Sequence, residues 1–258
     1  MSEFPIGVTL QQGRWTVTEW LAGEQARGRY RVRDASGKAG LLTLAPAQKR
    51  TTAELYQRFT SVALGVAELR YVGPLETTAA RYDGLIEDEP AGTPLAGRAM
   101  GAPIAFVASL CELMARAHVT GFVAAGLRPE LVYVDDAGRV TAVAPRCEPF
   151  LFTAGASSSG VVHCFDDYFA APEVLRTKPP PPAPAADVFS LTAILALLVS
   201  EEHPFVGDDA TTQLFSITGG QRRPWRGPEA LREIVDRGLD PVPERRPTAA
   251  ELAAALRS

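Results

Sequence analysis

Four arginines recur at every second position near the N-terminus. They are Arg27, Arg29, Arg31 and Arg33, and because successive side chains of a β-strand point to opposite faces, a strand would place all four on one face. We call these four residues the arginine row. Such a row could bind an anionic ligand or the carboxylates of a partner protein. The pattern is more typical of a solvated stripe whose aliphatic stems pack on the sheet.

Two pairs of aspartates could supply oxygen ligands to a metal ion. Asp135 and Asp136 stand together, and Asp166 and Asp167 follow His163 farther along the chain. The first pair precedes a glycine, which is the pattern of a turn. The second pair has no further group at metal-ligand spacing. We therefore expect no metal site and no resident cofactor.

The composition is that of a globular protein, with 258 residues of which 46% are hydrophobic and 22% are charged. The net charge of −4 gives no overall positive field for nucleic acid or an anionic membrane surface, so neither is an expected partner. The three cysteines lack the spacing of a zinc site or a disulfide framework.

The location of the protein can be predicted from its apolar segments. The N-terminus shows no signal-peptide pattern. The longest apolar run, residues 188–199, is shorter than the roughly 20 residues that a membrane-spanning helix needs. We expect a cytoplasmic protein in which this run forms a helix buried on all sides.

The first part of the chain, residues 1–91, is predicted to form a small sheet with one helix. Strand-like segments at 14–22, 29–35 and 40–45 are separated by glycine-containing turns, which indicates an antiparallel arrangement. Residues 51–70 carry apolar side chains at three- and four-residue spacing, which predicts one amphipathic helix.

The second part, residues 92–258, is predicted to be mainly helical. An irregular stretch at 146–169 and a proline-rich segment at 178–186, expected to be extended, separate its elements. A hairpin is expected at 131–143. Helices are expected at 104–119, 187–200, 229–238 and 248–256.

The order of a small sheet unit, one helix and a helical unit resembles the protein kinase fold, in particular that of bacterial serine/threonine kinases. Residues Ala171-Pro172-Glu173 resemble the Ala-Pro-Glu motif that ends a kinase activation segment. Asp187 and Arg246 stand where the family has a buried helix aspartate and the arginine that pairs with the motif's glutamate. The resemblance implies a bilobal α+β fold in which Glu173 and Arg246 form an ion pair as part of the structural core.

The residues that perform phosphoryl transfer in kinases are missing at the positions that the resemblance assigns to them. Thr43 stands for the phosphate-binding lysine and Val62 for the glutamate that holds that lysine. Gly126 replaces the aspartate base, and Leu131 replaces the metal-binding asparagine. Ala144 replaces the aspartate of the Asp-Phe-Gly motif. Neither Gly126 nor Leu131 can accept a proton or bind magnesium, so the resemblance implies a pseudokinase with no catalytic residue.

Two further features gain meaning from the resemblance. Arg29 stands where kinases have a valine that covers adenine, so the arginine row would face the nucleotide cleft and could fill it from within. Thr153 and the run Ser157–Ser159 fall in the activation-like segment 144–173. They could accept phosphate from an active kinase, although such runs are more often plain loops.

The sequence thus predicts a catalytically inactive pseudokinase that does not bind Mg-ATP. It would act as a protein-binding scaffold or an allosteric regulator of a partner, such as an active serine/threonine kinase or another signalling enzyme, and a homodimer fits this role. One alternative is a non-standard nucleotide-dependent transferase with Asp135, Asp136, Asp166 or Asp167 as metal ligands. Another is an anion or phosphopeptide sensor that uses the face Arg27–Arg33.

Overall fold

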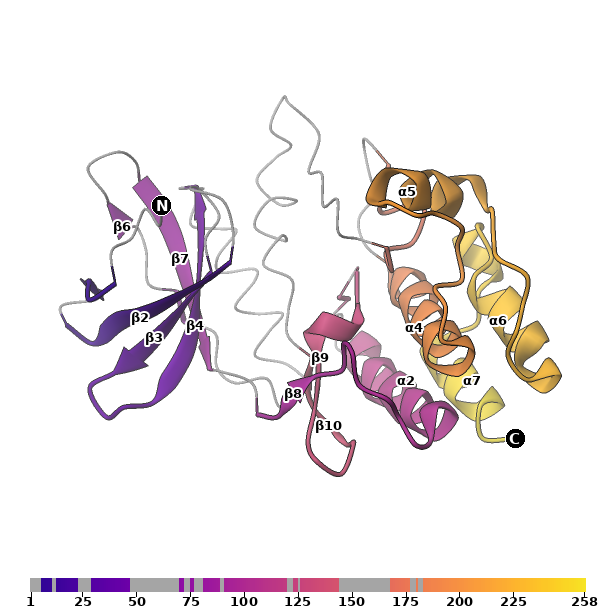
Figure 1. Ribbon diagram of the computed structural model, residues 1–258, viewed down its shortest axis with the longest axis horizontal. Helices are drawn as coiled ribbons and strands as arrows, with labels where there is room; N and C mark the ends of the chain where they lie inside the picture. The colour runs from indigo at the N-terminus through magenta and orange to yellow at the C-terminus, as the bar shows by residue number, and fades with distance from the viewer. Residues whose placement is uncertain are drawn as a thin grey trace. The chain divides into compact units, whose positions relative to one another are not determined.

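The chain forms two compact units, one from the described residues up to 88 and one from residue 91 onward. A computed structural model describes residues 6–10, 13–22, 29–46, 70–71, 75–76, 81–88, 91–119, 123–124, 126–143, 168–176, 180 and 183–258. The described part of the first unit is a sheet, and the second unit is mainly helical (Figure 1). The predicted α+β class is confirmed at this level.

The first unit is a fully antiparallel sheet in the order β1-β2-β3-β4-β7-β5, with β6 paired to β7. The three predicted strand segments are confirmed as β2, β3 and β4. The helix predicted at 51–70 lies outside the described residues except for Arg70, which belongs to a strand instead. The strands are β1 (Thr9–Leu10), β2 (Trp15–Ala22), β3 (Arg29–Asp34), β4 (Ala39–Pro46), β5 (Arg70–Tyr71), β6 (Leu75–Glu76) and β7 (Arg81–Asp88).

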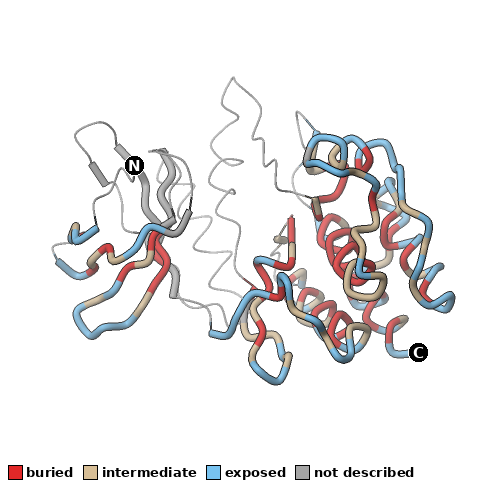
Figure 2. The backbone as a smooth tube through the Cα atoms, viewed as in Figure 1, coloured by how far each residue is buried: buried red, intermediate tan, exposed pale blue. Residues whose placement is uncertain are grey.

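Alternating side chains give this sheet one apolar face. Trp15 and Val17 of β2 pack with Tyr30 and Val32 of β3 in a buried cluster that also includes residues of β1, β4 and β7. Figure 2 shows the buried stretches of this sheet in red. Because side chains alternate along a strand, Arg31 and Arg33 of β3 occupy positions of the opposite face. The common face predicted for the arginine row is therefore consistent with the positions of these two residues.

The second unit combines a three-stranded sheet, in the order β10-β9-β8, with helices. Its strands are β8 (Thr93–Pro94), β9 (Val132–Val134) and β10 (Val140–Val143). The α-helices are α2 (Pro103–Val119), α4 (Pro184–Ser200), α5 (Ala210–Gly219), α6 (Arg232–Gly238) and α7 (Ala249–Ala255), and the short 3-10 helices are η1 (Pro129–Leu131), η2 (Glu229–Leu231) and η3 (Pro243–Arg245).

Most of the predicted elements of this unit are present. The predicted C-terminal boundary of the proline-rich extended segment is wrong. The extended segment predicted at 178–186 does not run to its last residues, since α4 already begins at Pro184. Proline is well accommodated in the first turn of a helix, where its missing N–H has no partner to lose. Helix α5 was not anticipated, although its start carries a capping box formed by Asp209 and Thr212.

Helix α4 is the centre of the helical unit. Residues 186–196 are all buried, which confirms most of the run predicted at 188–199, whereas residues 197–199 are half-buried. Helices α2, α6 and α7 pack around α4. Figure 2 shows the buried stretch along α4. No helix in the described part of the chain has the length and apolar character that a membrane span requires.

Helix α4 ends at a strained residue. Glu201 follows it with a φ of 59°, and among the described residues it is the only non-glycine with a positive φ. Since Glu201 is exposed, we expect Glu201→Gly to raise the free energy of unfolding by roughly 0.5 to 1 kcal/mol, because glycine adopts this conformation without a Cβ penalty. Urea denaturation measures the change. Glu201→Ala is the matched control, and a glycine variant no more stable than the alanine variant would contradict the prediction.

Candidate functional site

A buried carboxylate connects three segments of the helical unit. Asp187 lies in the first turn of α4 and is fully buried. Its Oδ2 accepts a hydrogen bond from the backbone N–H of Ala124 at 2.9 Å and lies 2.9 Å from Nε2 of His118 at the end of α2. A buried charge is tolerated only with such partners. Asp187 therefore fixes the segment that leads to Gly126, and His118 serves as its structural partner.

Gly126, at the position expected for the catalytic base, is buried. Its φ is 151°, a conformation that residues with a side chain rarely adopt. Leu127 beside it is fully buried. The backbone at this position is therefore suited to glycine and poorly suited to aspartate.

Leu131, at the position expected for the metal-binding asparagine, is buried at the end of η1. It is followed directly by β9, whose Val132 is also fully buried. Neither Gly126 nor Leu131 offers a polar side-chain atom. At these two positions the chain therefore presents buried apolar or glycine residues.

The remaining kinase-like positions are only partly described. The backbone of Thr43 in β4 pairs with that of Arg29 in β3. The predicted positions Val62 and Ala144 lie outside the described residues, and so does Arg27.

Two members of the arginine row are engaged within their own sheet. Arg31 forms an ion pair with Glu19, its neighbour on β2. Nη1 of Arg33 donates a hydrogen bond to the carbonyl oxygen of Gly37 at 3.0 Å. An anion that approached Arg31 would have to compete with the carboxylate already beside it.

Glu173 and Arg246 form a bidentate ion pair. Nη1 and Nη2 of Arg246 donate to Oε1 and Oε2 of Glu173 at 2.7 and 2.9 Å. Arg246 also donates to the carbonyl oxygens of Asp240 at 2.7 Å and Ala185 at 2.9 Å. Its guanidinium carbon lies 5.0 Å from the centre of the Phe189 ring. The pair that the resemblance implies thus joins the 171–173 motif to the segment before α7 and to the start of α4.

A second connection to the same region was not evident from the sequence. Nε2 of His203 lies 2.8 Å from the carbonyl oxygen of Tyr168, and Nδ1 accepts a hydrogen bond from the Phe205 N–H at 3.3 Å. Because a carbonyl only accepts, Nε2 carries the proton and the imidazole is neutral. Burial, together with the positive charge of Arg223, lowers the pKa of His203 to about 4. His203 therefore holds the chain before the motif in its neutral form.

Of the acidic residues considered as metal ligands, Asp135 and Asp136 are described; Asp136 is exposed, and Asp135 is held within its own turn. Oδ1 and Oδ2 of Asp135 accept hydrogen bonds from the N–H and Nε of Arg139, both at 2.9 Å. The backbone hydrogen bond from Arg139 lowers the pKa of Asp135, so the residue acts as a turn residue. Among the described residues no three His, Cys, Asp or Glu side chains gather as a metal site would require.

Other predicted positions cannot be placed. Asp166 and Asp167 lie outside the described residues, as do Thr153 and the run Ser157–Ser159.

Comparisons with known proteins identify several kinases as relatives, although no protein-family model matches the chain. The probable serine/threonine-protein kinase PkwA of Thermomonospora curvata is 31% identical over 152 residues, which are 58% of this chain and 20% of that protein. Serine/threonine-protein kinase PkaA of Streptomyces coelicolor is 29% identical over 170 residues, 64% of this chain and 30% of that protein.

A plant kinase is similar over a shorter stretch. Calcium-dependent protein kinase 22 of Oryza sativa subsp. japonica is 41% identical over 91 residues, 33% of this chain and 15% of that protein. The chain thus matches less than a third of the length of each of these relatives. It is a distant and partial homologue of serine/threonine protein kinases, bacterial ones among them.

Proposed function

We propose that this chain is a kinase-like protein that does not transfer phosphate and that acts as a binding module. The observation that carries the proposal is the pair Gly126 and Leu131. Both are buried, and neither offers a polar side-chain atom where the kinase base and a magnesium ligand are expected. Groups that act together in catalysis leave little activity when they are lost together.

The parts of the kinase architecture that do not perform chemistry support a binding role. Asp187 is still buried and hydrogen-bonded, and Glu173 and Arg246 still pair. A folded surface is thus maintained without the transfer groups. The partner we propose is another signalling protein, such as an active serine/threonine kinase, which this chain would scaffold or regulate; a second copy of the chain is compatible with the same role.

The two alternative functions receive less support from the described residues. A transferase with non-standard metal ligands would need free carboxylates, yet both oxygens of Asp135 are used within its own turn. An anion sensor at the arginine row would have to displace Glu19 from Arg31.

Thermal denaturation with nucleotide tests the proposal. A ligand that binds only the folded state raises the melting temperature, so we expect no shift with millimolar ATP, with or without magnesium. A radiolabelled transfer assay with a general protein substrate should give no signal above the level without protein. A bacterial serine/threonine kinase assayed in parallel is the positive control. Magnesium-dependent stabilisation together with phosphate transfer would overturn the proposal.

A further inference from the structure

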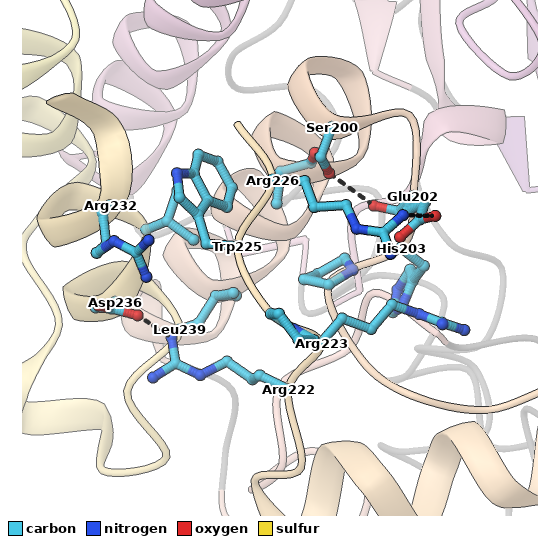
Figure 3. Close-up of a pocket in the computed structure, with 14 residues that line it drawn as sticks. Ser200, Glu202, His203, Arg222, Arg223, Trp225, Arg226, Arg232, Asp236 and Leu239 are labelled. Carbon is cyan, nitrogen blue, oxygen red and sulfur yellow. Dashed lines mark hydrogen bonds and ion pairs between the residues drawn. The ribbon is translucent and has the colours of Figure 1, made fainter. Parts of the chain in front are cut away.

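A pocket lies in the helical unit beside His203. It has a volume of about 210 Å³ and lies among the C-terminal part of α4, the segments around residues 203 and 222–226, and helix α6 (Figure 3). Ala196, Val235 and Leu239 supply apolar surface, and Trp225 supplies an aromatic ring. The whole pocket is built from residues of one compact unit.

The charge of the lining is opposite to that of the chain. Four arginines and two carboxylates line the pocket, which gives the lining a net charge of +2, whereas the chain as a whole carries −4. One of the four, Arg232, also forms an ion pair with Glu229 just outside the lining. His203, the remaining titratable group of the lining, is neutral near pH 7 because burial lowers its pKa to about 4. The arginines are Arg222, Arg223, Arg226 and Arg232, and the carboxylates are Glu202 and Asp236.

Three of the guanidinium groups are held in place by hydrogen bonds but keep further N–H donors that make no bond to the described part of the chain. Arg222 donates to Asp236 at 2.8 Å and Arg226 to Glu202 at 2.9 Å (Figure 3). Arg223 donates to the carbonyl oxygen of Phe205 at 3.3 Å. Within the described residues each of these three makes one such bond through its guanidinium. Since a guanidinium has five N–H donors, most of them are left for a ligand.

The aromatic wall is also fixed. Nε1 of Trp225 donates to the carbonyl oxygen of Pro228 at 3.0 Å. The ring lies so close to Gly227 that a Cβ added there would be 2.3 Å from Cζ2 of the indole. An indole held in this way supplies a flat apolar surface to the lining of the pocket, and flat rings stack on such surfaces.

We infer that this pocket binds a phosphate monoester carried on a flat organic group. A phosphate monoester has a charge of about −1.5 to −2 at neutral pH, which matches the lining, and arginines pair with its oxygens through parallel hydrogen bonds. The volume is below the roughly 300 to 1,000 Å³ of pockets for drug-sized ligands, so one phosphorylated ring fits better than a whole nucleotide. The inference does not depend on whether the chain transfers phosphate.

Calorimetric titration of the full chain with phenyl phosphate tests the inference. We expect saturable binding that weakens as salt is raised. Arg223→Gln/Arg226→Gln should weaken it by about tenfold or more, because it removes two charged donors. Arg237→Gln is the matched control, because Arg237 is an exposed arginine of α6 outside the pocket lining. The inference would be overturned if phenyl phosphate showed no saturable binding at millimolar concentration. It would also be overturned if Arg237→Gln lowered the affinity as much as Arg223→Gln/Arg226→Gln.

A second variant tests the aromatic wall and leaves every arginine intact. Gly227→Ala should displace the indole of Trp225, since the new Cβ would overlap it. We expect it to weaken phenyl phosphate and to leave the weaker binding of inorganic phosphate unchanged. Equal affinities of the unmodified chain for the two ligands would overturn the role of Trp225. A melting curve of each variant checks that it is folded.

A further titration, with a phosphorylated peptide, identifies the source of the phosphate monoester. A short peptide of glycine and serine around one phosphotyrosine carries the same phosphorylated ring as phenyl phosphate. Tighter binding of the peptide would support a phosphorylated partner chain as the natural ligand, and tighter binding of phenyl phosphate would support a free small molecule. The unphosphorylated peptide is the control, and binding of it with equal affinity would contradict recognition of the phosphoryl group.

Discussion

Replacing Arg246 with methionine is expected to lower the free energy of unfolding of the helical unit by about 3 to 5 kcal/mol, the usual effect of removing one partner of a buried ion pair. The substitution leaves the carboxylate of Glu173 in a site where its side chain is only 10% exposed. It also removes the donors to the carbonyl oxygens of Asp240 and Ala185. Urea denaturation followed by helical circular dichroism measures the loss.

The matched control for this experiment is the preceding residue. Arg245 is exposed, so Arg245→Met removes the same charge with the same side chain and should change stability by less than about 0.5 kcal/mol, as is usual for surface positions. A loss of equal size in both variants would show that net charge, not the buried pair, sets the stability.

A double-mutant cycle separates the pair from its surroundings. Glu173→Leu/Arg246→Met removes both charges, and such exchanges are often far less destabilising than the loss of one partner. We therefore expect the double variant to be more stable than Arg246→Met alone. Additive losses would mean that Glu173 and Arg246 do not stabilise each other, and that the carbonyl contacts of Arg246 account for its effect.

The sequence predicts the parts of the fold that depend on local patterns. The alternation in Trp15–Ala22 and Arg29–Asp34 is enough to identify β2 and β3, because the period of a strand appears directly in the order of residues. The apolar run at 188–199 likewise identifies the buried helix. The Glu173–Arg246 contact spans 73 positions, and it was predictable only because both residues stand in motifs that resemble those of kinases.

The start of α4 and the whole of α5 show where local patterns are insufficient. The proline run before α4 favours extended structure, yet Pro184 occupies the first turn of the helix, where proline is tolerated. Helix α5 (Ala210–Gly219) contains three threonines and ends on a glycine, and both residue types have low helix propensity. Its capping box and the left-handed Gly220 that ends it were the available signals.

The site features that sequence reasoning missed are contacts between residues far apart along the chain. His203 lies 35 positions from Tyr168, and Arg226 lies 24 positions from Glu202. No spacing rule connects such residues, because the folded chain alone brings them together. Three arginines of the pocket, Arg222, Arg223 and Arg226, do stand close together in the sequence, but only the folded chain brings them together with Glu202 and with Arg232 and Asp236 of α6.

The neutral state of His203 makes the stability of the protein dependent on pH. Burial lowers its pKa from 6.5 to about 4, against the opposing effect of the hydrogen bond to Tyr168. Between these two values the unfolded chain binds a proton that the folded chain does not, so the free energy of unfolding falls as the pH falls. Above pH 6.5 the contribution is fully present, and below the folded pKa it is lost.

The expected loss is about 2 kcal/mol on going from pH 7 to pH 5 and about 3 kcal/mol in total at lower pH, since one pKa unit corresponds to about 1.4 kcal/mol. His203→Gln provides the comparison, because glutamine can still donate to the Tyr168 carbonyl but does not titrate. Groups that titrate in both proteins cancel when the two unfolding curves are subtracted at each pH. Parallel curves for the two proteins between pH 7 and pH 5 would contradict the assignment, whereas convergence toward acid pH would show that the imidazole must be neutral to hold the segment before Ala171-Pro172-Glu173.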